Sequence, residues 1–286
     1  MLSHIKNLVW IILLLVFVIC ATLITNVASP LDKSVVVYYS FNDGKATDTS
    51  GNGNDGAVSG AKAADGKYGK SMDFDGKSWI EVKANKTLDL GNITMAAWIY
   101  KDEVFLANNG ENIISKKQGG AYTITVGGWE NHGGCGEKLE TEMRISGTYH
   151  FVCDKNKLPL KEWIHVASTH DGKDMKIFLN GKEVGSKACP GKIDFNTANF
   201  YVGAESDGGG PDDDHGRWVG KIDEVYVANR AFSEKEIQEL MNSPLRRSEG
   251  VTWDRLPAYP TKLTIEKTDE TPQDTTHAYH PANHII

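Results

Sequence analysis

Short runs in which apolar and polar residues alternate, separated by clusters of Gly, Asn and Asp, recur along most of this chain. Side chains of a strand point alternately to opposite faces, so such runs are typical of strands. Many of them at short spacing predict an all-β protein made of two packed sheets. The expected strands cover residues 35–41, 72–74, 79–82, 94–100, 112–116, 122–126, 143–146, 149–152, 164–170, 175–179, 200–203 and 218–228.

Tight turns are marked by Gly and Asn. Residues 75–77 (Asp-Gly-Lys) predict a hairpin between the strands on either side of them, and residues 171–173 (Asp-Gly-Lys) predict another. The dipeptide Asn180-Gly181 is the strongest two-residue hairpin signal. Residues 94–100 are apolar on both faces, so we expect this strand at the centre of a sheet.

One short helix is expected near the end of the sandwich. Ser233, followed three residues later by Glu236, forms a capping box, in which the two side chains satisfy free amides of the first turn. Ile237, Leu240 and Met241 then recur at helical spacing. The expected helix covers residues 233–242, and the sandwich covers residues 35–245.

Both ends of the chain differ in composition from the middle. Lys6 is followed by residues 8–24, which carry no charge. This pattern is typical of a secretory signal peptide or, without cleavage, of an N-terminal membrane anchor over residues 1–28. Either alternative exports the rest of the chain, so we expect a secreted, periplasmic or membrane-anchored protein. Residues 246–286 lack periodicity and are expected to form a flexible polar tail.

Composition excludes some classes of function. The 286 residues carry 31 Lys and Arg against 38 Asp and Glu, a net charge of −7. Nucleic acid is therefore excluded as the main partner, because its phosphates require a basic surface. Hydrophobic residues make up 40% of the chain, which is close to the globular average and excludes a polytopic membrane protein. Contact with a membrane is expected only through the N-terminal segment, if it is not cleaved.

Export makes a disulfide possible. Apart from Cys20 in the N-terminal segment, the chain has Cys135, Cys153 and Cys189, and the sequence allows three single pairings. We favour Cys135–Cys153, because a bridge across one loop or hairpin requires the least rearrangement. Cys189 is then a free thiol, or else the true partner of one of the others.

Several motifs together resemble LamG-like (laminin G-like) domains of the concanavalin A-like lectin/glucanase superfamily. The resemblance implies a two-sheet antiparallel jelly-roll sandwich with one short C-terminal helix, over about residues 35–245. This fold hosts lectin-like modules, adhesion domains and parts of enzymes, so it does not by itself imply one function. The motifs that carry it lie at residues 39–44 (YSFNDG), 48–54 (DTSGNGN), 69–76 (GKSMDFDG), 163–167 (WIHVA), 176–181 (KIFLNG), 201–203 (YVG), 221–225 (KIDEV) and 232–237 (FSEKEI).

A calcium site is expected at the Gly/Asn-rich segment 48–56, since Ca²⁺ prefers about six to eight oxygen ligands. Asp223 is in phase with Val225 along its strand, which predicts a carboxylate on an otherwise apolar face that needs a cation or several amide donors. LamG-like domains often hold a calcium ion between this loop and this aspartate, so the resemblance implies a structural Ca²⁺. Its ligands would be Asp48, Asn52, Asn54 and Asp223. In the alternative, Asp48 caps an Asx-turn and Asp223 accepts backbone amides.

Two loops are candidates for ligand binding. Segment 127–136 places an aromatic ring, which can stack on a sugar face, on a Gly-rich loop. Segment 205–216 is acidic but lacks the EF-hand spacing. The alternative for segment 127–136 is a connection held by a disulfide, in which Trp129 only covers the edge of the core. The alternative for segment 205–216 is a solvated acidic loop. The candidate ligand-binding residues are Trp129, Asn131, His132, Asp207, Asp212 and Asp214.

No catalytic residue is assigned from the sequence. Glycosidases of this architecture use paired carboxylates, and the nearest approach is Glu140-Thr141-Glu142, which we interpret as a solvated edge because Lys138 and Arg144 flank it. We therefore expect a non-catalytic exported module that binds a glycan or another extracellular ligand and is stabilised by calcium. The alternatives are a polysaccharide-active hydrolase or lyase and a protein-binding adhesion module.

Overall fold

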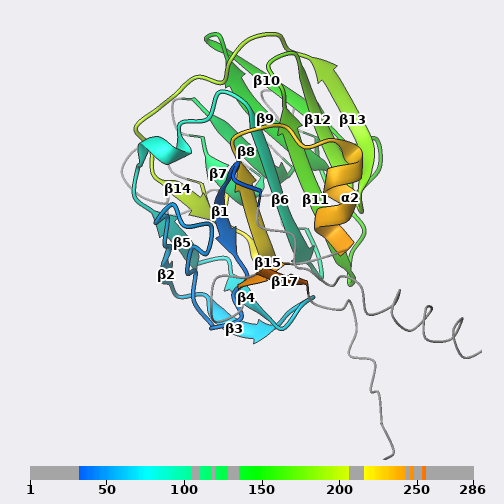
Figure 1. The fold of residues 1–286 in the computed structure, drawn as a ribbon. Coiled ribbons are helices and arrows are strands. Elements are labelled where there is room, and N and C mark those ends of the chain that lie inside the picture. The colour runs from blue at the N-terminus through cyan, green and yellow to red at the C-terminus, as the bar shows by residue number, and fades with distance from the viewer. Residues whose placement is uncertain are drawn as a thin grey trace, which may run out of the picture.

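The computed structural model describes residues 32–104, 110–117, 120–127, 135–205 and 216–242, and the backbone of two further short strands. Two antiparallel β-sheets pack face to face, and one short helix lies near the C-terminal end of the sandwich (Figure 1). The predicted fold class is confirmed. Within the described residues, no helix has the length and apolar character needed to cross a bilayer. The expected signal peptide or anchor over residues 1–28 lies outside the described residues.

The first sheet has eight strands. Seven of them follow the order β13-β12-β11-β6-β15-β4-β3, and β1 pairs with β15. As predicted, the strand expected over 94–100 is central, since it pairs on both sides. The strands are β1 (Val35–Tyr39), β3 (Lys62–Asp65), β4 (Lys70–Asp75), β6 (Ile93–Tyr100), β11 (Trp163–His170), β12 (Asp174–Leu179), β13 (Lys182–Ala188) and β15 (Val219–Ala228).

The second sheet has seven strands in the order β10-β9-β8-β7-β14-β5-β2. A 3₁₀ turn, η1 (Lys86–Leu88), follows β5 in the chain. Beyond the sandwich, β16 (Leu245–Arg247) pairs with β17 (Trp253–Arg255), where the sequence predicts no regular element. The strands of the second sheet are β2 (Ala57–Ser59), β5 (Trp79–Val82), β7 (Glu111–Lys116), β8 (Tyr122–Val126), β9 (Leu139–Ile145), β10 (Thr148–Cys153) and β14 (Phe200–Val202).

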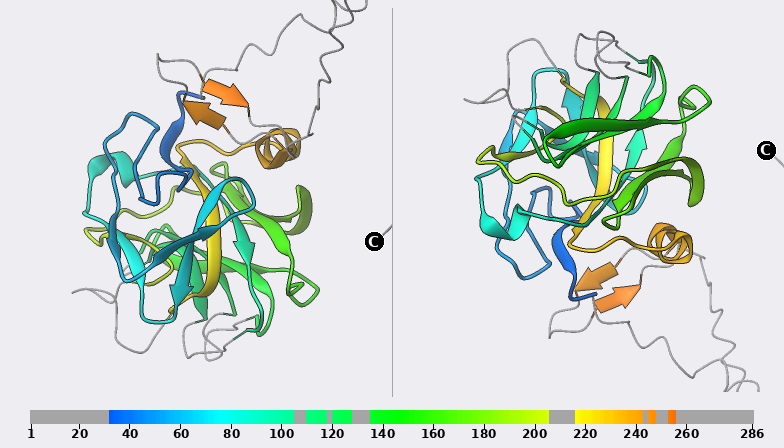
Figure 2. Two further views of the ribbon diagram at one scale, coloured as in Figure 1. Left: turned by 90° about the horizontal axis from the view of Figure 1, so that it is seen from below. Right: turned by 90° about the horizontal axis from the view of Figure 1, so that it is seen from above.

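The helix α2 (Glu234–Asn242) begins as its capping box predicts. The amide of Ser233 donates to Glu236 Oε2 over 2.7 Å, and the amide of Glu236 donates to Ser233 Oγ over 3.3 Å. Ile237 is fully buried in a cluster with Phe178 and Tyr226 on the outer face of the first sheet. In both views of Figure 2 the gold helix lies against this sheet, on the side away from the second sheet.

The Asn180-Gly181 hairpin between β12 and β13 is also confirmed. Both residues have positive φ, 48° and 75°, as a type I′ turn requires. Because Asn and Gly accept this backbone conformation, the dipeptide sets the register of the two strands.

The hairpin predicted around residues 75–77 is wrong. β4 belongs to the first sheet and β5 to the second, so the turn carries the chain from one layer to the other. The amide of Asp75 donates to Ser78 Oγ over 3.1 Å, and the amide of Lys77 donates to Asp75 Oδ1 over 3.0 Å. Phe74 and Ile80, on either side of the turn, both enter the shared core. A hairpin and a connection between two sheets therefore show the same alternation of apolar and polar residues around the turn.

The predicted phase of Asp223 is also wrong, because β15 contains a β-bulge. The register against β6 shifts between Asp223, opposite Trp98, and Tyr226, opposite Ala96. Glu224 has a φ of 50° at this point. The extra residue reverses the alternation, so Val225 enters the core while Asp223 lies beside Trp98 on the outer side. Asp223 is nevertheless fully buried.

Gly203 is predicted to be a position at which even one added methyl group destabilises the sandwich. Its φ is +80°, and a Cβ there would lie 2.5 Å from ring carbons of the buried Phe74. Gly51 has a φ of +90° but no heavy atom within 4 Å of the same position. We expect Gly51→Ala to lower the free energy of unfolding by about 1–2 kcal/mol, and Gly203→Ala to lower it by a further ~1–3 kcal/mol. Urea unfolding measures both, and equal losses would contradict the packing argument.

Candidate functional site

The outer face of the second sheet carries a row of mostly polar side chains. Ile124, Val126 and Met143 point into the core, so the residues that alternate with them point outward. Cross-strand pairing aligns these residues across five neighbouring strands. The row runs through Tyr201, Ser115, Thr123, Glu142 and Phe151.

An ion-paired group lies on this face, and we call it the outer-face cluster: Asn112, Lys117, Thr123, Glu140, Glu142 and Glu205. Lys117 Nζ lies 3.1 Å from Glu142 Oε2 and 3.6 Å from Glu205 Oε1. Asn112 donates to Glu205 Oε2 over 3.2 Å, and Thr123 donates to Asn112 Oδ1 over 2.8 Å. The cluster therefore joins residues on β7, β8 and β9 with the segment that follows β14.

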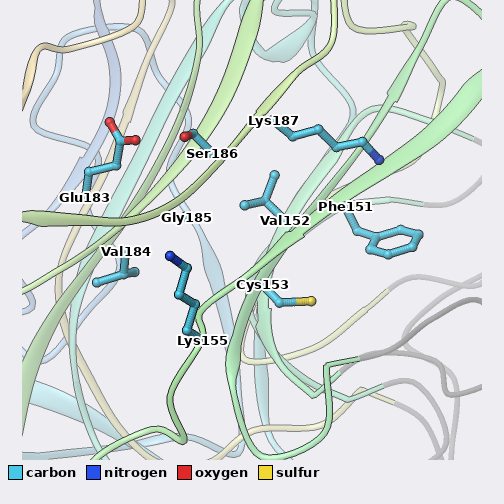
Figure 3. Close-up of a pocket in the computed structure, with 9 residues that line it drawn as sticks. All are labelled: Phe151, Val152, Cys153, Lys155, Glu183, Val184, Gly185, Ser186 and Lys187. Carbon is cyan, nitrogen blue, oxygen red and sulfur yellow. The ribbon is translucent and has the colours of Figure 1, made fainter.

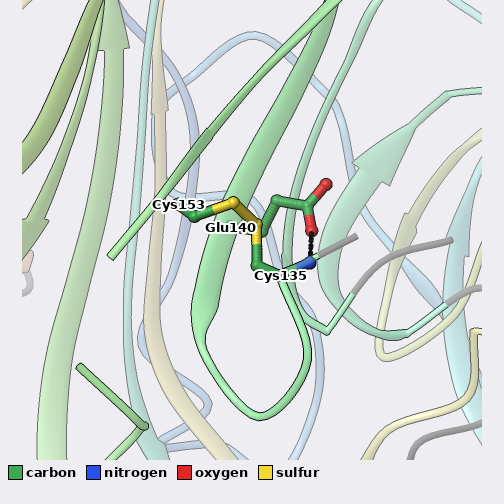
Figure 4. A group of neighbouring side chains, drawn as sticks. All are labelled: Cys135, Glu140 and Cys153. Atoms are coloured by element: carbon green, nitrogen blue, oxygen red, sulfur yellow. Dashed lines mark hydrogen bonds between the residues drawn. A yellow bond between two sulfur atoms is a disulfide. The ribbon is translucent and has the colours of Figure 1, made fainter. Parts of the chain in front are cut away.

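The cluster is adjacent to a disulfide. Cys135 is bonded to Cys153, with Cα atoms 5.8 Å apart, which is the pairing favoured from the sequence. Cys153 is the cross-strand partner of Glu140, and the amide of Cys135 donates to Glu140 Oε2 over 3.3 Å (Figure 4). Both sulfur atoms lie within 4.8 Å of a Glu140 oxygen. Because they are bonded to each other, they offer no thiolate to a metal. Cys189 is a buried free thiol.

Burial and neighbouring charges shift the pKa values of the titratable groups in the cluster. The pKa of Glu140 is raised to about 8, chiefly by burial and also by the Glu142 charge, while the Cys135 amide and Lys117 act to lower it. Burial also raises the pKa of Glu205. Desolvation would lower the pKa of Lys117, but Glu205 and Glu142 raise it above its ordinary value. At neutral pH the cluster thus presents a largely protonated acid, Glu140, next to an ion-paired cation.

The interpretation of Glu140 and Glu142 as a solvated edge is wrong. Glu140 is 2% exposed, and β9 lies between β8 and β10 rather than at the edge of its sheet. The flanking charges Lys138 and Arg144 suggested a wet surface. The signal that could have found the pair is the alternation of Glu140 and Glu142 with the apolar residues Leu139 and Met143, which indicates a strand within a sandwich.

Both loops singled out from the sequence begin or end at this cluster. Gly127 and Cys135 close the first loop through an amide-to-carbonyl hydrogen bond of 3.2 Å. The second loop begins at Glu205, and the carbonyl of Gly216 at its end accepts the amide of Asn112 over 2.9 Å. The predicted ligand-binding residues Trp129, Asn131, His132, Asp207, Asp212 and Asp214 lie outside the described residues.

The expected calcium ligands on the loop after β1 are engaged in hydrogen bonds. Asp48 Oδ1 accepts the amides of Tyr38 (3.1 Å) and Ser50 (2.9 Å). Asp48 Oδ2 accepts the Ser50 hydroxyl and the Asn54 amide, both over 2.9 Å. The bond from the Ser50 amide is the Asx-turn named above as the alternative to calcium. All of the lone-pair positions of this carboxylate are therefore occupied.

The two asparagines also bond to the neighbouring backbone. Asn52 donates to the carbonyl of Val35 over 3.1 Å, and Asn54 donates to that of Val36 over 2.8 Å. Asn54 Oδ1 accepts hydrogen bonds from the side chains of Asn85 (3.2 Å) and Thr87 (3.0 Å). These contacts hold the loop against β1 and η1.

Asp223 is satisfied by a different segment. It accepts the amides of Tyr68 over 3.0 Å and Glu224 over 2.8 Å. Burial raises its pKa to about 7, against these amides, which lower it. In the described part of the chain, Asp48 and Asp223 accept hydrogen bonds from different groups, which favours the alternative of an Asx-turn at Asp48 and backbone amides at Asp223. A calcium ion here stays a prediction from the sequence, and melting with and without a chelator decides between it and this alternative.

Comparison with known proteins identifies one family. The profile of the concanavalin A-like lectin/glucanases superfamily matches residues 74–238. No curated protein sequence matches the chain.

Solved structures share the fold at low sequence identity. Domain 4 of AbnA, an extracellular GH43 arabinanase from Geobacillus stearothermophilus, solved with arabinotriose, superposes with a TM-score of 0.57 at 20% identity, covering 73% of this chain and 98% of that domain. The binding domain of Paraclostridial Mosquitocidal Protein 1 superposes with a TM-score of 0.57 at 18% sequence identity, covering 75% of this chain and 54% of that one. The binding domain of Botulinum neurotoxin DC, solved in complex with SialylT, superposes with a TM-score of 0.53 at 14% sequence identity, covering 73% of this chain and 51% of that one. This chain spans about half of each of the two toxin domains.

The raised pKa of Glu140 predicts a pH-dependent stability. Between its ordinary value of 4.5 and about 8, the folded protein keeps a proton that the unfolded chain loses. The contribution is complete below pH ~4.5 and is lost as the pH rises through about 8. We therefore expect Glu140→Gln, which mimics the protonated acid, to gain stability relative to the wild type by up to about 1.4 kcal/mol per pH unit in this range. Urea unfolding of both proteins at several pH values measures this, and a constant difference would contradict it.

The hydrogen bonds of Asp48 and Asp223 predict that removing calcium has little effect. If Ca²⁺ were bound at about 100 times its dissociation constant, it would add about 2.7 kcal/mol, or about 5–10 °C in melting temperature. We expect the same melting temperature with and without a chelator, because the amides already satisfy these carboxylates. A fall on chelation that calcium reverses, and that Asp48→Asn abolishes, would instead support the calcium ion expected from the sequence.

Proposed function

Since the chain belongs to the concanavalin A-like lectin/glucanases superfamily, we propose that it is an exported, non-catalytic module that binds a carbohydrate on the outer face of its second sheet. The outer-face cluster supplies directional polar contacts. The loops over residues 127–136 and 205–216 supply the aromatic ring and further polar groups.

One observation carries this proposal: the ends of both candidate loops meet at the outer-face cluster. Glu205 and Cys135, which each adjoin one of the loops, bond to Asn112 and Glu140 of the cluster. Glu142 and Lys117 each keep about 15% of their side chains exposed, so they remain accessible beside the buried Glu140. A sugar there would find both hydrogen-bond donors and acceptors, which is what recognition of hydroxyl groups requires.

The relatives support the ligand class. The arabinanase domain was solved with a bound trisaccharide, and one of the toxin binding domains with SialylT. The arabinanase is extracellular, and the Cys135–Cys153 disulfide of this chain is typical of oxidising compartments outside the cytoplasm. Both points favour export and a glycan partner.

Oligosaccharide binding tests the proposal. A glycan array that includes arabinotriose identifies the ligand, and titration calorimetry then measures its affinity for the variants. We expect Trp129→Ala and Glu142→Gln each to weaken binding about tenfold or more, since one hydrogen bond to a charged group contributes about 1.5–3 kcal/mol. Glu239→Gln, at an exposed position on α2 away from the second sheet, is the matched control.

Absence of binding to every glycan, or equal affinity of Glu142→Gln and wild type, would contradict the proposed site. Capture of a protein partner that does not depend on sugar would favour the adhesion module.

One observation favours hydrolysis as a second candidate function. Glu140, with its pKa raised to about 8, and Glu142, two residues along the same strand, place an acid and a carboxylate on one face. A hydrolase requires such a pair. Release of reducing ends from the bound polysaccharide, lost in Glu140→Gln while binding persists, would establish this activity. Binding without turnover would support the non-catalytic module.

A further inference from the structure

A groove of about 480 Å³ lies where the two sheets meet at their edges, between β10 and β13 (Figure 3). β10 is the last strand of the second sheet, and β13 is the last strand of the first. Phe151 at its rim is the cross-strand partner of Glu142, so the groove begins one strand beyond the outer-face cluster. It is lined by Phe151, Val152, Cys153, Lys155, Glu183, Val184, Gly185, Ser186 and Lys187.

Gly185 determines how closely the two strands approach. A Cβ at this position would lie 2.8 Å from the carbonyl oxygen of Cys153 and 3.0 Å from Val152 Cγ1. A glycine therefore lets β13 pack directly on β10, and Val152, which is 6% exposed, forms part of the groove wall. The groove is a product of this close packing between rigid strands, as preformed ligand sites usually are.

The lining is cationic although the chain as a whole carries a net charge of −7. It holds Lys155, Lys187 and Glu183, a net charge of 2 − 1 = +1. Lys176 Nζ already pairs with Glu183 over 2.9 Å and lowers the pKa of its carboxyl group. Lys187 Nζ lies 5.2 Å from the centre of the Phe151 ring, within the range of a cation–π contact.

Within the described residues, neither Lys155 nor Lys187 pairs with a carboxylate. Figure 3 shows these two lysines on either side of Val152. Their amines point to opposite sides, that of Lys187 toward Phe151, so the groove offers two separate cationic positions rather than one shared position.

We propose that this groove binds a saccharide that carries a carboxylate, such as a uronic acid residue. Its volume matches small-molecule sites, which occupy about 300–1,000 Å³. Lys155 and Lys187, on opposite sides of Val152, each bind a carboxylate of a different sugar residue through a charge-assisted hydrogen bond. The sugar hydroxyls bond to main-chain groups of β10 and β13 that face no further strand in the described part of the chain, and to the Ser186 hydroxyl, whose other partner is Glu183. This site is separate from the outer-face cluster, and its argument does not depend on the function proposed for that cluster.

Titration calorimetry with the full chain tests this assignment at low and at physiological salt. The probe is a trimer of galacturonic acid, and its methyl ester is the uncharged control with the same sugar backbone. We expect the acid to bind at least ten times more tightly than the ester. Lys155→Gln and Lys187→Gln should each weaken binding of the acid several-fold, and the double variant should abolish it. Lys182→Gln removes an exposed lysine of β13 that does not line the groove and should bind as the wild type does.

Several results would overturn the proposal. These are no binding of the acid, equal affinity for acid and ester, or full binding by the double variant. If Glu142→Gln loses binding but the lysine variants do not, the binding site is the outer-face cluster and not the groove. Inorganic phosphate is the third probe, and binding as tight as that of the trimer would reduce the groove to a site for any anion.

Discussion

The packing of two apolar sheet faces against each other is the constraint on which the rest of this structure depends. Met95, Ile99, Ile124 and Leu139 are fully buried between the layers. Burial of apolar surface contributes roughly 25 cal/mol per Å², so the central strands of both sheets each present one face to this interior. The opposite faces are then available for other purposes: α2 covers that of the first sheet, and the outer-face cluster occupies that of the second.

Burial of charged groups is the second consequence of this packing. Lys117 lies between Glu142 and Glu205, Asp223 accepts amides at the bulge of β15, and Lys101 pairs with Glu111. Each buried charge thus has a partner, since removing one partner of such a pair costs about 3–5 kcal/mol. Glu140 is satisfied differently, by retaining its proton. This places one neutral acid among charged groups, which distinguishes the cluster from the solvated surface around it.

Local patterns could be predicted because the residues that make them are adjacent in sequence. Asn180-Gly181 specifies its turn through positive φ, and Ser233 with Glu236 caps α2. The strands β2 and β3 were missed, since they are short and their side chains are mostly exposed. Placement of β4 and β5 in different sheets was also missed, because the turn between them has the composition of a hairpin. The burial of Glu140 depends on how distant segments pack over it.

The sequence by itself determined the all-β class, most of the strands, the helix, the family resemblance and the favoured cysteine pair. The elements and the cysteine pair follow from periodicity, turn chemistry and spacing, and the family resemblance follows from short motifs; all of these are local properties. Only the tertiary structure decided which strands share a sheet, that a bulge turns Asp223 away from the core, and that Glu140, Glu142, Glu205 and Lys117 form one cluster. The physical reason is that strand pairing joins residues far apart in the chain, and one extra residue in a strand reverses the direction of every side chain beyond it.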